Sequence, residues 1–118
     1  MARLEPPGFQ RFQQVMPGSL KVTFAGSEAS IAASYAYLGG EATFVTALPH
    51  HEIAEACLAD LRSLGVDTRH IVRTHEGRLG LYYFERGVNQ RPANVIYDRD
   101  GSSVSLTPAD AYNWDQIF

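Results

Sequence analysis

The sequence predicts an α/β fold joined to a small antiparallel β element. In the first 73 residues, strand-like and helical segments alternate, and glycines follow both helical segments. This alternation is typical of parallel sheets with right-handed crossover helices. From residue 79 onward, two β-rich runs are separated only by a polar loop, which favours a hairpin. With 118 residues, the chain is one ordinary domain or part of a larger one.

Composition limits the class of protein. Apolar residues make up 45% and charged residues 19%, so the chain can bury a core and is not disordered by composition. Its net charge of -3 gives no electrostatic footprint for nucleic acid or an anionic membrane. Cys57 is the single cysteine, which excludes an intramolecular disulfide framework and a thiolate zinc cage. No apolar run approaches the roughly 20 residues of a membrane span. We therefore expect a protein of the reducing cytoplasm.

The N-terminal elements follow from local patterns. Residues 1–18 are expected to be irregular, although residues 1–4 can form the second half of a strand. Residues 20–24 alternate apolar and polar side chains, as a half-exposed strand does. A helix then begins with Ser27 as its N-cap and ends at Gly39 and Gly40. Its expected apolar face comprises Ala29, Ala32, Ala33, Ala36 and Tyr37.

The next elements continue the alternation. Residues 43–48 predict a short strand that Pro49 ends, and residues 70–73 predict another. Between them, residues 52–64 predict an amphipathic helix that Gly65 stops. Its expected inward positions are Ile53, Ala56, Cys57, Ala59, Leu61 and Leu64.

The C-terminal part changes character. Residues 79–86 and 94–98 predict an antiparallel hairpin, and pairing of this hairpin with residues 20–24 as a separate small sheet stays open. Thr107 and Pro108 are typical of a helix start. Trp114, Ile117 and Phe118 resemble the apolar face of a helix that has just begun. Three parallel strands with two helices make a thin core, so we expect the N-terminal part of a larger α/β protein.

Gly26 is the first candidate site residue. It lies between a strand end and a helix start, where backbone N–H groups point outward and favour anions. Two interpretations are open. Either a ligand hydroxyl or carboxylate lies against the backbone at this glycine, or the glycine only supplies the geometry of an ordinary turn.

Two tyrosines and an arginine in the hairpin are the second candidate. Tyr82 lies on one predicted strand, while Tyr97 and Arg99 share a face of the other by their spacing of two. Such a surface can grip an acidic, hydroxylated ligand, since a guanidinium binds a carboxylate and phenol hydroxyls bond sugar hydroxyls. The alternative is ordinary strand aromatics beside a solvated arginine.

Other chemistry-bearing residues predict no site. The four histidines lack the spacing of a zinc site, so no metal ligand is expected, and Cys57 is expected to be an inert core residue. Asp98 and Asp100 are interpreted as turn formers, not as a catalytic pair. The chain contains no nucleophile elbow, P-loop lysine motif or dinucleotide fingerprint.

An ordered set of motifs runs from end to end of the chain. They are LEPPG (4–8), PG (17–18), VTFAGSEA (22–29), YLGG (37–40), FVTALP (44–49), LRSLGVD (61–67), GLY (80–82) and VIYDR (95–99). Together they resemble the N-terminal third of a ribokinase-like carbohydrate kinase of the PfkB family. Within that family, the resemblance is greatest to the 2-keto-3-deoxygluconate kinases.

The resemblance implies a three-layer α/β body with a small antiparallel β lid, here formed by residues 20–24, 79–86 and 94–98 within a single domain fragment, 1–118. It implies transfer of the γ-phosphate of ATP to a sugar hydroxyl, with Mg²⁺, by a dimer joined through its lids. Gly26 and residue 30 would line the sugar site, Tyr82 and Tyr97 would contact a sugar acid, and Arg99 would bind its carboxylate.

Two departures from the family pattern matter. Residue 30 is serine where the family usually has asparagine, which leaves another substrate open, for example fructose or a nucleoside. No motif matches the family's anion hole and catalytic aspartate, which lie near its C-terminus. We therefore expect no catalytic residue and no ATP or Mg²⁺ binding in this segment alone, which by itself should be inactive. A non-catalytic sugar-binding or dimerisation module is the remaining alternative.

Overall fold

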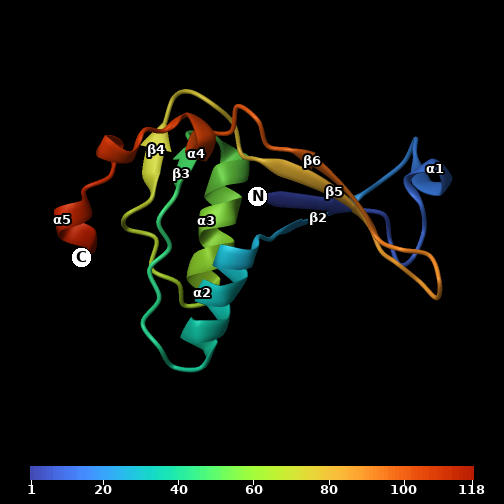
Figure 1. Cartoon of the computed structure of the whole chain (residues 1–118), viewed down its shortest axis with the longest axis horizontal. Coiled ribbons are helices and arrows are strands. Elements are labelled where there is room, and N and C mark those ends of the chain that lie inside the picture. The colour runs from blue at the N-terminus through green and yellow to red at the C-terminus, as the bar shows by residue number, and fades with distance from the viewer.

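The computed structural model describes all residues from 1 to 118. The chain forms two parts that lie side by side along its longest axis, and its overall extents are 49 × 35 × 23 Å (Figure 1). One part is a β-sheet. The other packs helices around a smaller sheet, and the N-terminus lies where the two parts meet (Figure 1). None of the helices combines the length and the apolar character that crossing a bilayer requires.

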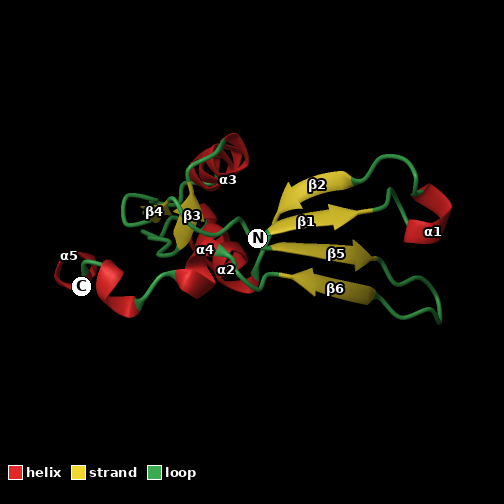
Figure 2. Ribbon diagram, turned by 90° about the horizontal axis from the view of Figure 1, so that it is seen from above, coloured by secondary structure: helices red, strands yellow, loops and turns green.

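The larger sheet has four strands in the order β2-β1-β5-β6 (Figure 2). They are β1 (Ala2–Glu5), β2 (Lys21–Phe24), β5 (Leu81–Glu85) and β6 (Asn94–Asp98). β1 is antiparallel to β2 and parallel to β5, while β5 and β6 form an antiparallel hairpin. The hairpin expected from the sequence is therefore present. It does not pair with β2 directly, because β1 lies between them.

The N-terminal 18 residues are more regular than expected. Besides β1, they contain the short helix α1 (Phe12–Val15), which lies at the end of the sheet far from the other helices (Figure 2). The Phe12 ring meets the Tyr83 ring edge-on at 6.1 Å, and the Phe12 backbone N–H donates to a Glu85 carboxylate oxygen at 2.8 Å. Contacts with residues more than 70 positions later in the sequence therefore hold this helix in place.

The smaller sheet has two strands, one fewer than the parallel sheet that the sequence predicts. Only β3 (Ala47–Pro49) and β4 (Val72–Thr74) pair in parallel. The first strand of the expected parallel set, residues 20–24, forms β2 of the other sheet, because four residue pairs join it to β1. β3 is also shorter than predicted: Thr43 makes only an isolated bridge with Asp67, and Pro49 lies within the strand.

Helix α2 (Ser27–Tyr37) packs a face of small residues against the core. The residues of this face are Ala29, Ala32, Ala33 and Ala36. Tyr37, expected on the same face, is 88% exposed. Gly26, not Ser27, is the N-cap, so no side chain caps the start of the helix. Gly39 has φ +88°, and its N–H donates to Ala36 O, so glycine ends the helix as expected.

Helix α3 (Glu52–Ser63) supplies four of the nine buried residues of the core cluster. Its N-cap His51 accepts a hydrogen bond at Nδ1 from Ala54 N at 3.2 Å. The buried residues are Ala54, Cys57, Leu58 and Leu61. Two of the six expected inward positions, Cys57 and Leu61, are therefore confirmed. The other four are exposed, with Ile53 at 58% and Leu64 at 48%.

Three short helical segments end the chain. They are α4 (Ser103–Leu106), the 3₁₀ turn η1 (Ala109–Ala111) and α5 (Trp114–Ile117). The turn after Pro108 and the helix near residue 114 were expected, whereas α4 was not. In α5, the Trp114 ring stacks on Phe118, with centroids 6.2 Å apart, and both rings stay exposed. The core thus lies between α2, α3 and β3, next to the root of the larger sheet.

Candidate functional site

Gly26 joins β2 to α2 in a conformation that favours glycine. Its φ is +155°, and the Ser30 N–H donates to its carbonyl oxygen at 2.9 Å. A Cβ atom at this position would meet only a carboxylate oxygen of Glu28, at 3.9 Å. The backbone conformation therefore requires glycine here, while the space around its Cα is open.

One row of side chains crosses all four strands of the larger sheet. The register pairs Arg3 with Thr23 on one side and with Tyr82 on the other, and Tyr82 with Tyr97. Directly paired residues share a face of a sheet, so the four side chains lie on one face. The rings of Tyr82 and Tyr97 have centroids 6.0 Å apart, and Arg3 Nε donates to Thr23 Oγ1 at 3.0 Å. Arg3 was not predicted from the sequence.

Arg99 extends this face beyond the end of β6. Its guanidinium carbon lies 4.7 Å from the centroid of the Tyr97 ring, which is the geometry of a cation–π contact. No hydrogen bond or ion pair within the chain involves this guanidinium. All of its N–H donors are therefore available to a ligand.

A cleft of about 380 Å³ lies between the root of the sheet and the helices. Gly26, Glu28, Ser30 and Arg99 all line it. Much of the remaining lining is apolar: Phe24, Phe44, Val45, Leu48, Leu61 and Leu79. Tyr82 and Tyr97 do not line the cleft itself. The structure thus brings three of the five predicted site residues, Gly26, Ser30 and Arg99, to one cleft. Tyr97 lies outside the cleft but contacts Arg99, and the Tyr82 ring lies beside the Tyr97 ring.

Glu28 also lines the cleft and was not predicted from the sequence. Hydrogen bonds from its own backbone N–H and from the Ser27 hydroxyl hold the pKa of the Glu28 carboxyl below its usual value, and the positive charge of Arg99 adds to this. The cleft thus holds a carboxylate and a guanidinium of opposite charge that attract each other. An acidic residue in the first turn after the conspicuous Gly26 was the signal available in the sequence.

Cys57 also lines the cleft, on its apolar side. The side chain is buried, and this burial raises the pKa of the Cys57 thiol. Since the thiolate is the reactive form, a raised pKa fits the expected role of an inert core residue. No three His, Cys, Asp or Glu side chains gather in a group that could hold a metal ion.

Comparison with known proteins identifies the family. Residues 8–118 match the model of the pfkB family carbohydrate kinases. The chain belongs to this family. The resemblance predicted from the motifs is therefore confirmed, and so is the ribokinase-like α/β fold class. Figure 1 shows the α/β body and the additional sheet of this chain as two parts.

Several relatives carry names of sugar-acid kinases. The chain is 34% identical over 110 residues to a 2-dehydro-3-deoxygalactonokinase of Haloferax volcanii, covering 93% of this chain and 34% of that protein. It matches the crystal structure of a 2-dehydro-3-deoxygluconokinase of Thermotoga maritima with a TM-score of 0.93 and 40% identity, covering 99% of this chain and 35% of that one. A ribokinase of Staphylococcus aureus is 30% identical over 88 residues, which are 75% of this chain and 28% of the ribokinase. The chain thus spans about one third of the relatives that it matches.

Proposed function

We propose that this chain is the substrate-recognising N-terminal part of an ATP-dependent kinase of 2-keto-3-deoxygluconate (also called 2-dehydro-3-deoxygluconate) or a similar sugar acid. The observation that carries this proposal is the unpaired guanidinium of Arg99, held over Tyr97 at the cleft that Gly26 lines. A guanidinium without an internal partner binds a carboxylate through two parallel charge-assisted hydrogen bonds. The names of the sugar-acid kinases among its relatives support the same substrate class.

The other predicted residues have matching roles. The phenol groups of Tyr82 and Tyr97 are donors and acceptors for sugar hydroxyls, since both lie on the face that continues to Arg99. The backbone at Gly26 lets a hydroxyl approach closely because no Cβ stands in the way. Ser30 is exposed at the cleft and offers a short hydroxyl donor and acceptor to the sugar.

The residues of this chain do not fit ATP or Mg²⁺. No three potential metal-ligating side chains come together, and no glycine-rich phosphate loop follows any of the strands. We assign nucleotide binding, Mg²⁺ and the catalytic base to parts of the kinase outside these residues. By this assignment, the 118-residue chain binds the sugar acid but does not transfer phosphate. An ATP-dependent kinase of a small metabolite fits the cytoplasm, where we place it.

The opposite face of the sheet supports a lid-to-lid dimer as part of the same proposal. The register aligns Val22, Leu4, Tyr83 and Ile96 across the four strands. This row is one residue along each strand from the row that contains Tyr82, so its side chains point to the opposite face. Val22 and Ile96 are 55% and 50% exposed. A second copy of this chain, packed against this apolar face, would cover it and leave the Arg99 face toward the cleft.

The proposal is tested by titration calorimetry with two ligands. One is 2-keto-3-deoxygluconate; the other is 3-deoxy-D-fructose, in which a hydroxymethyl group replaces the carboxylate. We expect Arg99→Ala to weaken binding of the acid by roughly 1.5–3 kcal/mol, the range for a lost charge-assisted pair, and to leave binding of the neutral sugar unchanged. Equal losses for both ligands would contradict the role of Arg99.

Kinase activity is tested in a chimaera. Residues 1–118 replace the corresponding third of the Thermotoga maritima enzyme, which is 40% identical over the match. We expect ATP consumption with sugar acids and none with the 118-residue chain alone. Preference of the chimaera for fructose or a nucleoside, with the unaltered Thermotoga enzyme as control, would instead support the alternative that Ser30 raises.

A further inference from the structure

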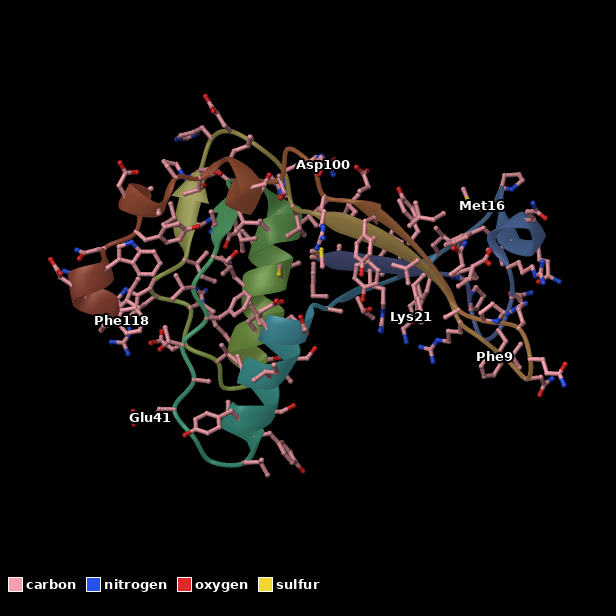
Figure 3. All side chains as sticks on the ribbon, in the orientation of Figure 1. Phe9, Met16, Lys21, Glu41, Asp100 and Phe118 are labelled. Atoms are coloured by element: carbon pink, nitrogen blue, oxygen red, sulfur yellow. The ribbon has the colours of Figure 1, made fainter.

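Arg78 makes three contacts with the turn that carries Arg99. Its Nη1 donates to Asp98 O at 2.9 Å, and its Nη2 donates to Asp100 O at 2.9 Å. Nη2 also pairs with the carboxylate of Asp98. Arg78 thus contacts both sequence neighbours of Arg99, which are Asp98 and Asp100. Asp100 marks the place of this turn, at the junction between the larger sheet and the helices (Figure 3).

The backbone of Arg78 is itself fixed. It forms a parallel bridge with Ser102, and its carbonyl oxygen accepts a hydrogen bond from Ser103 N at 2.9 Å. Ser102 and Ser103 are almost fully buried. The chain is so close here that a Cβ on Gly77 would lie 2.7 Å from Ser103 backbone atoms. The Arg78 guanidinium therefore extends from a rigid base.

Within the turn, the Ser102 N–H donates to Arg99 O at 3.1 Å, and Arg78 adds its contacts with Asp98 and Asp100. Residues 98–101 are all exposed, and Gly101 has φ +69°, so side-chain packing does little to hold the turn. Arg99 is also flanked by two carboxylates, on Asp98 and Asp100. By its place in β6, Asp98 lies on the opposite face from Tyr97 and Arg99, and its carboxylate is paired with Arg78.

We propose that Arg78 is a positioning residue for sugar-acid recognition: it fixes the turn between Asp98 and Asp100 and keeps the Arg99 guanidinium over Tyr97, free to bind a carboxylate. This inference rests on the proposed function of Arg99. It assigns Arg78 no contact with the substrate, although Arg78 also lines the cleft.

A double-mutant cycle separates positioning from direct contact. In the otherwise unaltered chain, we expect Arg78→Ala to weaken binding of 2-keto-3-deoxygluconate about tenfold, within the range of couplings between neighbouring residues. The affinity for 3-deoxy-D-fructose should change by no more than about twofold, since this neutral sugar has no carboxylate for Arg99 to bind. In the Arg99→Ala chain, the same Arg78→Ala change should have little further effect. Full additivity of the two losses would show that Arg78 binds the substrate itself, and would overturn the inference.

Two further variants grade the effect. Asp98→Asn removes the charge pair but keeps both contacts of Arg78 with backbone oxygens, so we expect a smaller loss than Arg78→Ala causes. Arg78→Lys keeps the charge but cannot reach all three oxygens in the same fork, so we expect partial rescue. Arg69→Ala is the matched control, because Arg69 is an exposed arginine paired with Asp67 away from the cleft. It should change binding of neither ligand.

A ligand-free measurement keeps the inference testable independently. In ¹⁵N-labelled chain, Arg78→Ala should speed amide hydrogen exchange of residues 98–102 and shift the Arg99 Nε resonance as the guanidinium leaves the Tyr97 ring. Dispersed spectra elsewhere establish that the variant is folded. If Arg99→Ala discriminates between the two ligands but Arg78→Ala changes neither discrimination nor exchange, the inference fails and the proposed function stands. If Arg99→Ala does not discriminate, the proposed function fails, and the exchange rates alone decide whether Arg78 holds the turn.

Discussion

The guanidinium of Arg99 lies 4.7 Å from the centroid of the Tyr97 ring, and Tyr97 is the register partner of Tyr82. A cation held on an aromatic face loses less rotamer freedom when a ligand arrives than a cation that moves freely in solvent. Under the proposed function, the contact therefore prepares one exposed arginine for a carboxylate. It also joins the hairpin to the cleft that Gly26 lines.

Substitutions at Tyr97 separate its ring from its hydroxyl. Tyr97→Phe keeps the ring beneath Arg99, so we expect discrimination between the acid and the neutral sugar to persist, with an affinity loss of about 0.5–1.5 kcal/mol for one hydrogen bond. Tyr97→Ala removes the ring as well and should cost a further 0.5–1 kcal/mol or so for the acid alone. Calorimetric titration of both variants with both ligands measures this. If Tyr97→Phe and Tyr97→Ala behave alike, the ring does not support Arg99.

Gly26→Ala tests whether the open backbone at the cleft matters. Because φ is +155° there, alanine should lower the free energy of unfolding by about 1–3 kcal/mol and weaken binding of both ligands. Gly8→Ala is the control: Gly8 has φ +59°, lies far from the cleft, and leaves open space for a Cβ. It should cost stability without changing affinity. Unaltered binding in folded Gly26→Ala would leave Gly26 as an ordinary turn residue.

Glu5 gives the chain a predicted acid sensitivity. The Glu5 side chain is 1% exposed and accepts hydrogen bonds from Arg86 Nε at 3.1 Å and Arg86 Nη2 at 3.0 Å. These bonds hold the pKa of the Glu5 carboxyl below its usual value, despite the opposing effect of burial. The unfolded chain therefore takes up a proton at higher pH than the folded chain does. The stabilisation is complete above the ordinary glutamate pKa and is lost as pH falls through the folded one.

Glu5→Gln isolates this contribution. At pH 7 we expect the variant to be less stable by roughly 1.5–3 kcal/mol, the range for hydrogen bonds to charged groups. The difference from the unaltered chain should shrink as pH falls below about 4. Urea denaturation of both chains across this pH range measures it, and other carboxyls cancel because both chains contain them. A difference that stays constant with pH would mean that the ion pair does not set the titration.

Charge on the apolar face of the sheet tests the proposed dimer. Ile96→Lys, at a position that is 50% exposed, should convert a dimer to a monomer without unfolding it, because a second copy would have to bury the ammonium. Ile53→Lys is the matched control on α3, where the isoleucine is 58% exposed and away from the sheet. Sedimentation equilibrium reports the mass of each. A chain that is monomeric before any substitution contradicts self-association through this face in the 118-residue form.

The hairpin and the shared face of Tyr97 and Arg99 were predictable because each depends on a short-range pattern. Spacing of two places Tyr97 and Arg99 on one face, and the glycine between strand and helix marks Gly26. The inward face of α3 was predicted only in part, for a different reason. Alanine occurs on both faces of this helix, so neighbours, not residue type, decide that Ala54 is buried and Ala56 exposed.

Long-range pairing accounts for the other differences. β1 inserts between β2 and β5 through partners about 20 and 80 residues away, which four residues of sequence do not reveal. Arg78 was not predicted because its guanidinium contacts three oxygens of Asp98 and Asp100, which lie 20 and 22 residues later in the sequence. A positively charged side chain alone gives no sign of such partners.

The central claim is that Arg99 receives the carboxylate of a sugar acid above Gly26. Titration of the ¹⁵N-labelled chain with 2-keto-3-deoxygluconate, followed by NMR, tests it most directly. We predict saturable shifts at the Arg99 Nε–H and the Gly26 amide, and with 3-deoxy-D-fructose a shift at Gly26 but not at Arg99. Saturable binding of the acid that leaves the Arg99 resonance in place, or shifts confined to the apolar end of the cleft around Cys57, would contradict the account.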